Sequence, residues 1–457
     1  MFVHNHLTHE SSLFDFRETA PAAATARRDE DDFRRTGRGV GVPGEIKGLW
    51  RAHQKLGKKP WKSLIEPVIQ LARNGFDCPK LLEKDLARRK KDLDWLASNF
   101  PTYAERFDSA IGSQKNAARV TRLDLADVLK ATAELGPSAI YEGPLAREIV
   151  TAVRDLGGVM TMQDLQDYEV VERKMINITL AGHQVLTFGA PSAGAVMLRM
   201  LSDMEEESDL KNTKLGSVEY YAELAKVFDG AFACRNLLGD PSFGVVRENE
   251  EKILDRSLKS ADLCGKEKRA SETKGTSHVS ILDQNELMVS MTTSMNWWFG
   301  SLIVTQSGIL LNNELDDFSK DSDSPNAVAP GKRPLSSMAP TIVYNQHRLC
   351  ESRMSIGGVN GSKIFTGVAQ VVGSFVLVER NIRHALDEPR IWCQESVPSK
   401  CLLEGGVEQV ASAVSTKAGF PVQAVDWRIS VVGAVMKRNN TLVSVTDDYA
   451  DWSGLTF

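Results

Sequence analysis

Residues 275–294 read GTSHVSILDQNELMVSMTTS, a stretch in which two runs of strand-forming residues flank the polar turn DQNE. This pattern predicts a β-hairpin. Pairing the two leucines next to the turn places Thr276 opposite Thr293 or Ser294. Several hydroxyl groups are therefore expected to lie together at one end of the hairpin.

Thr276 has the chemistry of a nucleophile that a cut before it would activate. A threonine hydroxyl inside a chain has no base of its own. Cleavage of the Gly275–Thr276 bond would give Thr276 a free α-amine, whose pKa of about 7.7–8.0 leaves a neutral fraction near pH 7. The hydroxyls of residues 292–294 would then position that amine by hydrogen bonds. For the hairpin alone, an ordinary edge hairpin with threonines that favour strand structure remains the alternative.

Other motifs surround the hairpin in a fixed order. After Asn296 come FGS at 299–301, SGILLNNELDDFS at 307–319 and PGKRPLSSMAP at 330–340, and upstream lie FRETAP at 16–21, VPGEI at 42–46 and IYEG at 140–143. Together with the stretch around Thr276, these motifs closely resemble the γ-glutamyltransferases, also known as glutathione hydrolases. The resemblance covers nearly the whole chain.

The resemblance implies a fold and a nucleophile. The fold would be that of the N-terminal-nucleophile hydrolases, an α+β four-layer αββα sandwich made by a precursor that cleaves itself. Residues 1–275 would form the large-subunit region and residues 276–457 the small-subunit region, and both would build one sandwich. Thr276 would act in self-cleavage and in catalysis, with Ser294 where the family has a threonine that contacts the nucleophile's amine. Neither a cofactor nor a metal is implied.

The same resemblance implies a pocket for a γ-glutamyl group. The family's ligands of the substrate's α-amino group match Asn296, Glu314 and Asp317, and its clamp on the α-carboxylate matches Arg17, Ser336 and Ser337. An ammonium and a carboxylate on one carbon require acceptors on one side and a guanidinium fork with hydroxyl donors on the other. Taken singly, the acidic residues read as a solvated loop, the arginine as a surface residue and the serines as a turn. Only the set is specific.

The expected oxyanion loop departs from the family pattern. It reads GGVNGSKI at 357–364, so that Asn360 stands where the family has the first glycine of a pair and Gly361 is the second. Backbone donors survive a change of side chain, and asparagine tolerates an unusual φ better than most residues. Asn360 also begins a glycosylation sequon, which we interpret as accidental because a glycan would block the pocket.

Composition excludes some classes of partner. The chain has 457 residues, 42% hydrophobic residues and a net charge of −5, which is typical of a soluble globular protein. It has no basic stripe or acidic tail, so neither a nucleic-acid partner nor a membrane surface is implied, and we expect no hydrophobic run to reach the length needed to span a bilayer. Its six cysteines lack metal spacing and are free or paired. The histidines at positions 4, 6 and 9 suggest a metal tract or a mobile polar N-terminus, and we expect the latter.

Periodicity predicts the order of the elements. The region from Trp50 to about Asp167 should be mostly helical, 179–188 a strand, 191–195 the start of a helix and 220–238 another helix. Residues 258–275 read as a flexible connector. Trp297 and Trp298 line an acceptor side or pack in the core, and we expect core packing.

Two departures from the family concern length. Family chains usually have a signal or anchor and a glycine-rich helical stretch before the segment that starts here at Phe2. We therefore expect the sequence to be truncated at its N-terminus, without a strand and a helix of the sandwich. The stretch from Asp317 to Ser336 is also shorter than the family pattern, which implies a more open donor pocket.

The expected activity follows from the resemblance. Thr276 Oγ would attack the γ-glutamyl amide of glutathione or a related compound, and the resulting γ-glutamyl-threonine ester would be resolved by water or by an amino-acid or dipeptide acceptor. The two fragments of the precursor would remain partners. Two alternatives stay open: a catalytically impaired truncated homologue, and an acylase for glutaryl-type amides, which would not need the substrate's α-ammonium. Family members are usually secretory, membrane-anchored or vacuolar, but this sequence indicates no compartment.

Overall fold

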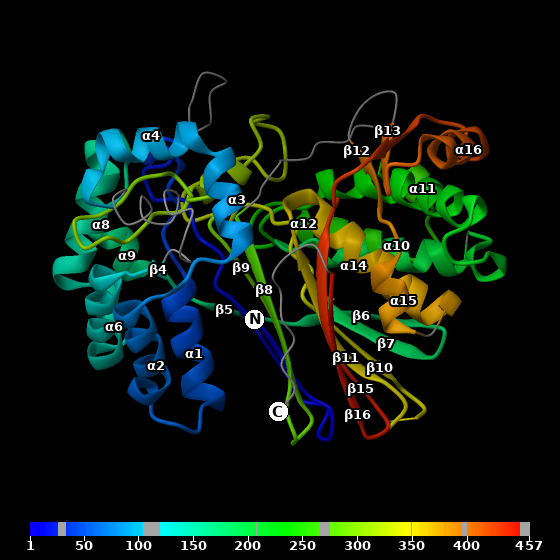
Figure 1. Cartoon of the computed structure of the whole chain (residues 1–457), viewed down its shortest axis with the longest axis horizontal. Helices are drawn as coiled ribbons and strands as arrows, with labels where there is room; N and C mark the ends of the chain where they lie inside the picture. The colour runs from blue at the N-terminus through cyan, green and yellow to red at the C-terminus, as the bar shows by residue number, and fades with distance from the viewer. Residues whose placement is uncertain are drawn as a thin grey trace.

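The computed structural model describes residues 1–25, 33–103, 119–206, 208–264, 275–348, 350–379, 381–394 and 400–447. Two β-sheets lie face to face, and helices cover the outer side of each (Figure 1). The interface between the sheets holds large apolar side chains from both, namely Phe2, Leu13, Leu186, Phe188, Met288 and Ile342. The predicted α+β four-layer αββα sandwich is therefore confirmed.

The first sheet has five strands in the order β5-β2-β1-β9-β8. Every neighbouring pair in it is antiparallel. The strands are β1 (Phe2–Asn5), β2 (Ser11–Asp15), β5 (Val171–Arg173), β8 (Thr276–Leu282) and β9 (Leu287–Ser294). The predicted hairpin is thus formed by β8 and β9, and its turn falls at residues 283–286.

The second sheet has six antiparallel strands in the order β16-β15-β11-β10-β7-β6. They are β6 (Met175–Leu180), β7 (His183–Phe188), β10 (Thr341–Asn345), β11 (Arg353–Val359), β15 (Val431–Arg438) and β16 (Thr441–Thr446). Two small sheets complete the strands: β3 (Phe76–Asp77) with β4 (Arg119–Val120), and β12 (Ile391–Gln394) with β13 (Lys400–Glu404) and β14 (Val422–Val425).

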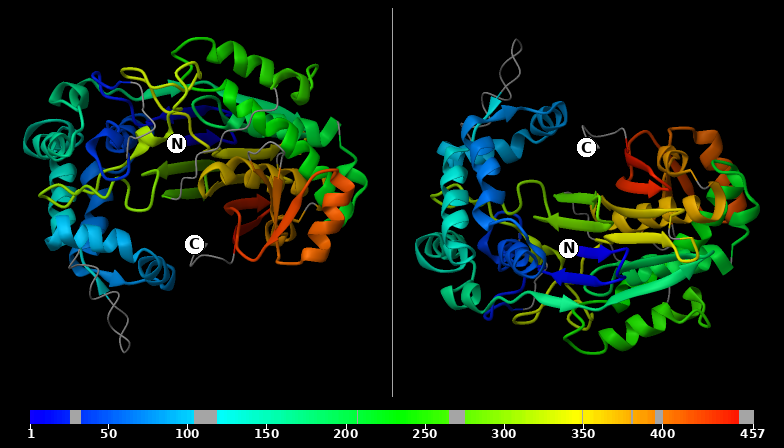
Figure 2. Two further views of the ribbon diagram at one scale, coloured as in Figure 1. Left: turned by 90° about the horizontal axis from the view of Figure 1, so that it is seen from above. Right: turned by 90° about the horizontal axis from the view of Figure 1, so that it is seen from below.

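Two groups of helices flank the sheets, as Figures 1 and 2 show. The group beside the first sheet comprises α1 (Glu45–Leu56), α2 (Trp61–Asn74), α3 (Lys80–Arg88), α4 (Lys90–Asn99), α6 (Leu123–Leu135), α7 (Ser138–Tyr141), α8 (Gly143–Asp155) and α9 (Met162–Asp167). The group beside the second sheet comprises α10 (Gly194–Glu206), α11 (Val218–Phe232), α12 (Val246–Leu254), α13 (Ser260–Leu263), α14 (Ile364–Gly373), α15 (Ile382–Asp387) and α16 (Glu408–Ala418).

The largest core lies between the second sheet and the helices α10, α11 and α14, which are buried along most of their length. The helical stretch Gly361–Val378, which includes α14, is long and apolar enough to cross a membrane by length and composition, and 89% of it is buried inside the protein. The expectation that no run reaches that length is therefore wrong. Here the apolar surface of the stretch is used for core packing.

Several predicted elements are confirmed and two are wrong. The described residues between Trp50 and Asp167 are mostly helical, a helix begins at Gly194, and α11 continues as a 3₁₀ turn to Leu237. The predicted single strand at 179–188 is instead the end of β6, a turn and β7. Within the predicted connector, Ser260–Leu263 is helical and Cys264 forms a disulfide with Cys234. Residues 265–274 of that connector lie outside the described residues.

The cysteines divide into two disulfides and two free thiols. Besides the bond to Cys264, Cys393 is bonded to Cys401 across the β12–β13 pair. Cys78 and Cys350 are free. The sequence had left both possibilities open.

The N-terminus is not mobile, so that prediction is wrong. His4 lies in β1, which pairs with β2 on one side and β9 on the other. The side chains of His4 and His6 are only 1% and 3% exposed, and His4 stacks on Tyr344 with ring centroids 5.4 Å apart. Among the described residues, no group of three or more His, Cys, Asp or Glu side chains is arranged to hold a metal ion.

Candidate active site

The hairpin of β8 and β9 places the proposed nucleophile at the start of a strand. Thr276 is the first residue of β8 and pairs with Ser294, one of the two partners expected from the sequence. Its hydroxyl Oγ1 donates a hydrogen bond to Ser294 Oγ at 3.3 Å. Hydroxyl-bearing residues thus meet at this end of the hairpin.

The residue before Thr276 must be small because the backbone of the segment that follows β9 lies against it. Gly275 N–H donates to the Asn296 carbonyl (2.8 Å), and Met295 N–H donates to the Gly275 carbonyl (3.0 Å). A Cβ on Gly275 would lie 2.2 Å from the Trp297 carbonyl oxygen. The pairing of β8 with β9 therefore continues through the Gly275–Thr276 bond and holds it extended.

Contacts across the sandwich place Thr276 opposite the end of β11. The contacts between β9 and β11 advance along both strands together. Arg353, at the start of β11, donates to Glu286, which precedes β9, and further along Ser290 Oγ donates to the Ile356 carbonyl at 2.9 Å. The ring of His278 then lies against Gly357, where an added Cβ would come within 2.2 Å of it. Because Thr276 lies two residues further along the same face of β8, it points toward the residues that follow β11.

His278 fills the space between the two sheets beside this position. Its ring nitrogens lie 2.9 Å from Thr292 Oγ1 and 2.8 Å from Ser280 Oγ. Burial lowers the pKa of His278 to about 3. The imidazole is therefore neutral at physiological pH and fills polar space between β8 and the second sheet, a role that the sequence did not reveal.

The loop after β11 contains Asn360 and Gly361. Asn360 adopts a left-handed conformation (φ 95°, ψ 48°), and Gly361 also has a positive φ of 61°. The expectation that asparagine would tolerate an unusual φ here is confirmed. The sequon is not available for a glycan in this conformation, because Asn360 Nδ2 donates to the Ile429 carbonyl at 2.5 Å.

Arg17, Glu314 and Asp317 form one buried cluster. Arg17 Nη1 lies 2.5 Å from Glu314 Oε2, and Arg17 Nη2 lies 2.5 Å from Asp317 Oδ2. The guanidinium also donates through Nε to the Pro334 carbonyl (3.2 Å) and through Nη2 to the Leu335 carbonyl (3.3 Å). Three residues far apart in sequence are thereby brought to one place, and the reading of the acidic pair as a solvated loop is wrong.

The electrostatics of this cluster follow from burial and an excess of negative charge. Burial raises the pKa of Glu314 to about 7, because it outweighs the lowering by Arg17, and the charge of Asp317 raises it further. Burial also raises the pKa of the neighbouring Glu18, and the charge of Glu314 adds to this rise. For Arg17, burial would lower the pKa, but the surrounding carboxylates outweigh it, so the guanidinium remains charged.

Asn296 lies between the hairpin and the acidic cluster. It is fully buried and has a positive φ of 68°. Its backbone N–H donates to Ser294 Oγ (2.8 Å), and its Nδ2 donates to the Asn313 carbonyl (3.0 Å). Its side-chain oxygen has no hydrogen-bond partner among the described residues, which leaves a buried acceptor beside Ser294.

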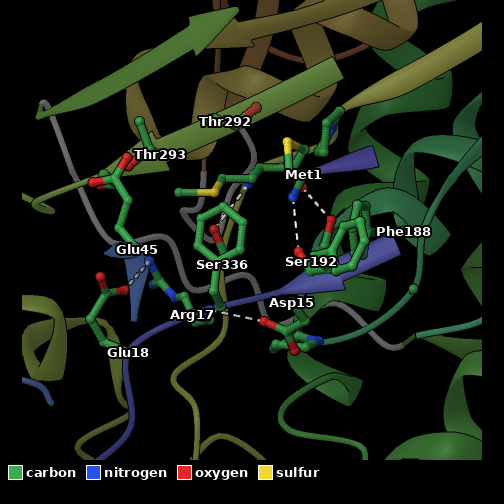
Figure 3. Close-up of a pocket in the computed structure, with 17 residues that line it drawn as sticks. Met1, Asp15, Arg17, Glu18, Glu45, Phe188, Ser192, Thr292, Thr293 and Ser336 are labelled. Atoms are coloured by element: carbon green, nitrogen blue, oxygen red, sulfur yellow. Dashed lines mark hydrogen bonds and ion pairs between the residues drawn. The ribbon is translucent and has the colours of Figure 1, made fainter. Parts of the chain in front are cut away.

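The two serines have different surroundings. Ser336 Oγ accepts a hydrogen bond from Met338 N–H at 3.2 Å, whereas Ser337 Oγ accepts one from Arg235 Nη2 at 3.1 Å. Arg17, Ser294 and Ser336 line one mainly apolar pocket, shown in Figure 3 with Met1 and Glu45 beside them. The lining of this pocket does not include Thr276, Glu314, Asp317 or Asn360, so the described pocket collects only part of the predicted set.

Glu45 is a further, partly buried carboxyl of this pocket. It lies at the first position of α1, and burial raises its pKa despite a hydrogen bond with Thr293. Glu18 and Glu45 belong to the motifs FRETAP and VPGEI, but the sequence did not predict a role for either. Their partial burial depends on the tertiary structure, so no local pattern could have distinguished them from surface carboxylates.

The two tryptophans after Asn296 are not core residues, which corrects that expectation. Both are partly exposed. Trp297 Nε1 donates to Asp316 Oδ2 at 2.9 Å and its ring lies under Arg34, with 5.2 Å between the guanidinium carbon and the ring centroid. Trp298 lies under Arg89 at 5.1 Å. They form a rim of stacked arginines and aromatic rings next to the acidic cluster.

Comparison with known proteins identifies a family that this chain matches in sequence. A sequence model described as gamma-glutamyltranspeptidase matches residues 1–455. A glutathione hydrolase proenzyme of Arthroderma benhamiae is 34% identical over 427 residues, covering 86% of this chain and 71% of that protein. Glutathione hydrolase 2 of Arabidopsis thaliana is 33% identical over 420 residues, with the same two coverages of 86% and 71%.

Solved structures agree in fold. The crystal structure of cephalosporin acylase from Bacillus halodurans superposes with a TM-score of 0.81 at 21% identity and covers 99% of this chain and 87% of that chain, which is evidence of a shared fold alone. The gamma-glutamyltranspeptidase of Helicobacter pylori has a TM-score of 0.50 at 26% identity and covers 56% of this chain and 75% of that chain.

Proposed function

This chain belongs to the gamma-glutamyltranspeptidase family, and we propose on that premise that it cleaves the γ-glutamyl amide of glutathione and related compounds. In this proposal the precursor first cuts itself between Gly275 and Thr276. The extended, backbone-paired conformation of that bond and its position beside the hydroxyl of Ser294 support this assignment. The cut frees the α-amine of Thr276, which becomes the base for its own hydroxyl.

The catalytic cycle then uses Thr276 twice. Its Oγ attacks the γ-glutamyl carbonyl carbon, and its α-amine takes the hydroxyl proton and passes it to the leaving amine. A γ-glutamyl-threonine ester forms as the amide C–N bond breaks. Water, or an amino-acid or dipeptide amine, attacks the ester and regenerates Thr276. Ser294 would hold the nucleophile through the hydrogen bond between the two hydroxyls.

Recognition of the substrate would exchange ion pairs inside the buried cluster. The α-carboxylate of a γ-glutamyl group would take the fork of Arg17, assisted by Ser336 and Ser337, and the α-ammonium would take the carboxylates of Glu314 and Asp317. The unpartnered buried oxygen of Asn296 is a further acceptor for the ammonium. The observation that carries this proposal is that one guanidinium and two carboxylates lie together in a buried cluster that Asn296 connects to Ser294.

A mutation at the nucleophile tests the proposal. The purified wild-type protein should show two bands on a denaturing gel, with a new N-terminus at Thr276, and should hydrolyse a γ-glutamyl anilide. Thr276→Ala should leave one band and no hydrolysis, because both reactions need the hydroxyl. Thr276→Ser keeps a hydroxyl and should retain part of both.

The substrate series separates this function from the alternatives. A glutaryl anilide, which lacks only the α-ammonium, should be a poor substrate, because the carboxylates of Glu314 and Asp317 would then stay buried without their cation. Equal turnover of both anilides would favour the acylase alternative. A folded wild-type protein that stays uncut and inactive would favour the impaired homologue.

A further inference from the structure

We infer that Asn360 is a positioning residue whose side-chain amide ties the loop after β11 to Ile429 and keeps the backbone N–H groups of that loop aimed at the reacting carbonyl oxygen. The inference rests on the proposed function and deepens it. It assigns a task to the one residue at which the oxyanion loop departs from the family pattern of two glycines. It also says why the departure is compatible with catalysis.

The backbone of the loop presents hydrogen-bond donors at one point. Asn360 and Gly361 both have positive φ, and the 3₁₀ turn Gly361–Lys363 leads directly into α14. A left-handed residue followed by a right-handed turn directs successive N–H groups into one concavity that suits an anion. The start of a helix adds the positive end of the helix dipole. Such groups are suited to stabilise the oxyanion of a tetrahedral intermediate.

The side chain of Asn360 holds this backbone to a neighbouring segment. Its Nδ2 donates to the Ile429 carbonyl at 2.5 Å. A glycine would adopt the same φ with no steric cost, but it would provide no such bond. Asparagine therefore restricts the backbone more than glycine would, and its side chain connects the loop to the segment before β15.

The other end of this tether is itself rigidly held. Ile429 N–H donates to Glu404 Oε1 at 2.5 Å, so the residue that accepts from Asn360 is bonded through its amide as well. Glu404 Oε2 also bonds Arg428 at 2.7 Å and accepts from the Arg390 N–H at 2.9 Å.

A second carboxylate completes the support. Asp447 lies 3.2 Å from Arg390 and 3.3 Å from Arg428, and it accepts from the Val432 N–H at 2.6 Å. Glu404, Arg390 and Asp447 are buried and Arg428 is partly exposed, and each charged side chain has a partner of opposite charge. Breaking one buried pair leaves an uncompensated charge, so the network resists displacement. Asn360 thus connects the loop to a stiff part of the molecule.

The tether should matter for the transition state more than for the bound substrate. A carbonyl oxygen in the ground state needs little stabilisation, whereas the oxyanion that develops on attack needs donors in fixed positions. Loosening the loop should therefore lower kcat and leave KM nearly unchanged. A residue with a purely structural role would instead lower stability and the amount of folded protein without this split.

The test compares two substitutions at Asn360 with a matched control. Asn360→Gly accepts the positive φ but removes the tether, and Asn360→Asp keeps the size and the φ preference but replaces the donor with an acceptor. Asn439 has a φ of 50° in the turn between β15 and β16, so Asn439→Gly makes the same exchange of a left-handed asparagine away from the site. Hydrolysis of a γ-glutamyl anilide and hydrogen exchange of the amides at 360–363 are measured for all three.

We expect Asn360→Gly and Asn360→Asp to lower kcat by about tenfold or more with KM within about twofold, since loss of one complete oxyanion donor costs about 10²–10³ in kcat. Exchange at residues 360–363 should accelerate in both, and Asn439→Gly should resemble wild type. An Asn360→Gly enzyme with wild-type kcat and unchanged exchange overturns the tether. If wild type itself lacks γ-glutamyl hydrolysis, the proposed function fails, but the tether can still be tested by hydrogen exchange at residues 360–363. Unchanged exchange in Asn360→Gly then overturns the tether, and faster exchange supports it.

Discussion

At the scale of single residues, the site depends on charges that are buried against each other. The guanidinium of Arg17 forms ion pairs with both Glu314 and Asp317, so the buried cluster holds more carboxylates than cations. Burial raises the pKa of Glu314. The sequence predicted the three residues through their resemblance to a family. It could not predict that they contact each other directly, because burial of an acidic loop depends on elements that are distant in the chain.

Arg17→Lys tests the fork rather than the charge. Lysine keeps the cation but loses the planar pair of donors that would hold the substrate's carboxylate, so we expect KM for a γ-glutamyl anilide to rise by about tenfold or more. Self-cleavage at Gly275–Thr276 needs no such carboxylate and should change far less. Steady-state kinetics and the ratio of the two gel bands measure the two effects.

The matched control for this change is Arg333→Lys. Arg333 is a similarly buried arginine that bonds the Glu169 carbonyl and lies near Asp15, outside the proposed clamp. It should lower thermal stability without a selective rise in KM. If Arg17→Lys lost self-cleavage and hydrolysis to the same extent, Arg17 would be a structural residue and its assignment to the substrate would be wrong.

At the scale of elements, sequence patterns located helices well and failed where polar residues occupy strands. Residues 179–188 contain strand-forming residues on both sides of the turn at Ala181-Gly182, and the alanine in that turn has a positive φ of 43° that its type does not suggest. The histidine-rich start of the chain read as a mobile terminus. Its strand β1 is central because β2 and β9 pair with it, a non-local fact that composition does not contain.

The buried histidine of β1 predicts a loss of stability at acid pH. Burial lowers the pKa of His4 to about 4, with further lowering from His6 and His9. Because the folded pKa lies below the unfolded value of about 6.5, the unfolded chain binds the proton more readily, and stability present above pH 6.5 is lost as the pH falls toward 4. Ser11 and Tyr344 face the ring and supply no charge that would offset this effect.

Unfolding by urea at pH 7 and at pH 5 measures the effect. The free energy of unfolding of wild type should fall by roughly 1–2 kcal/mol from His4 alone over that interval. His4→Gln, which cannot be protonated, should show a smaller fall between the same two pH values. An identical pH dependence in both proteins would show that His4 does not titrate on unfolding.

At the scale of the whole molecule, the proposed cleavage point does not separate two independent parts. In the first sheet β1 pairs with β9, so that Val3 lies opposite Val289. In the second sheet β7 pairs with β10, so that Val185 lies opposite Val343. Each sheet therefore combines strands from both sides of the Gly275–Thr276 bond. That residues 1–275 and 276–457 act as two subunit regions of one sandwich stays a prediction. The order of the strands could not be predicted because it arises from long-range contacts.

This interleaving predicts how the two fragments behave. Phe2 and Phe188, from before the cut, pack in the same layer between the sheets as Met288 and Ile342, which lie after the cut. Separating the fragments would expose these side chains at about 1.5–3 kcal/mol each, against a total stability of about 5–15 kcal/mol for a typical protein. We therefore expect residues 1–275 and 276–457, produced together as two chains, to elute as one complex in gel filtration and to part only in denaturant. Produced singly, each should be insoluble or unfolded by circular dichroism, and two separately folded, separately eluting fragments would contradict a shared sandwich.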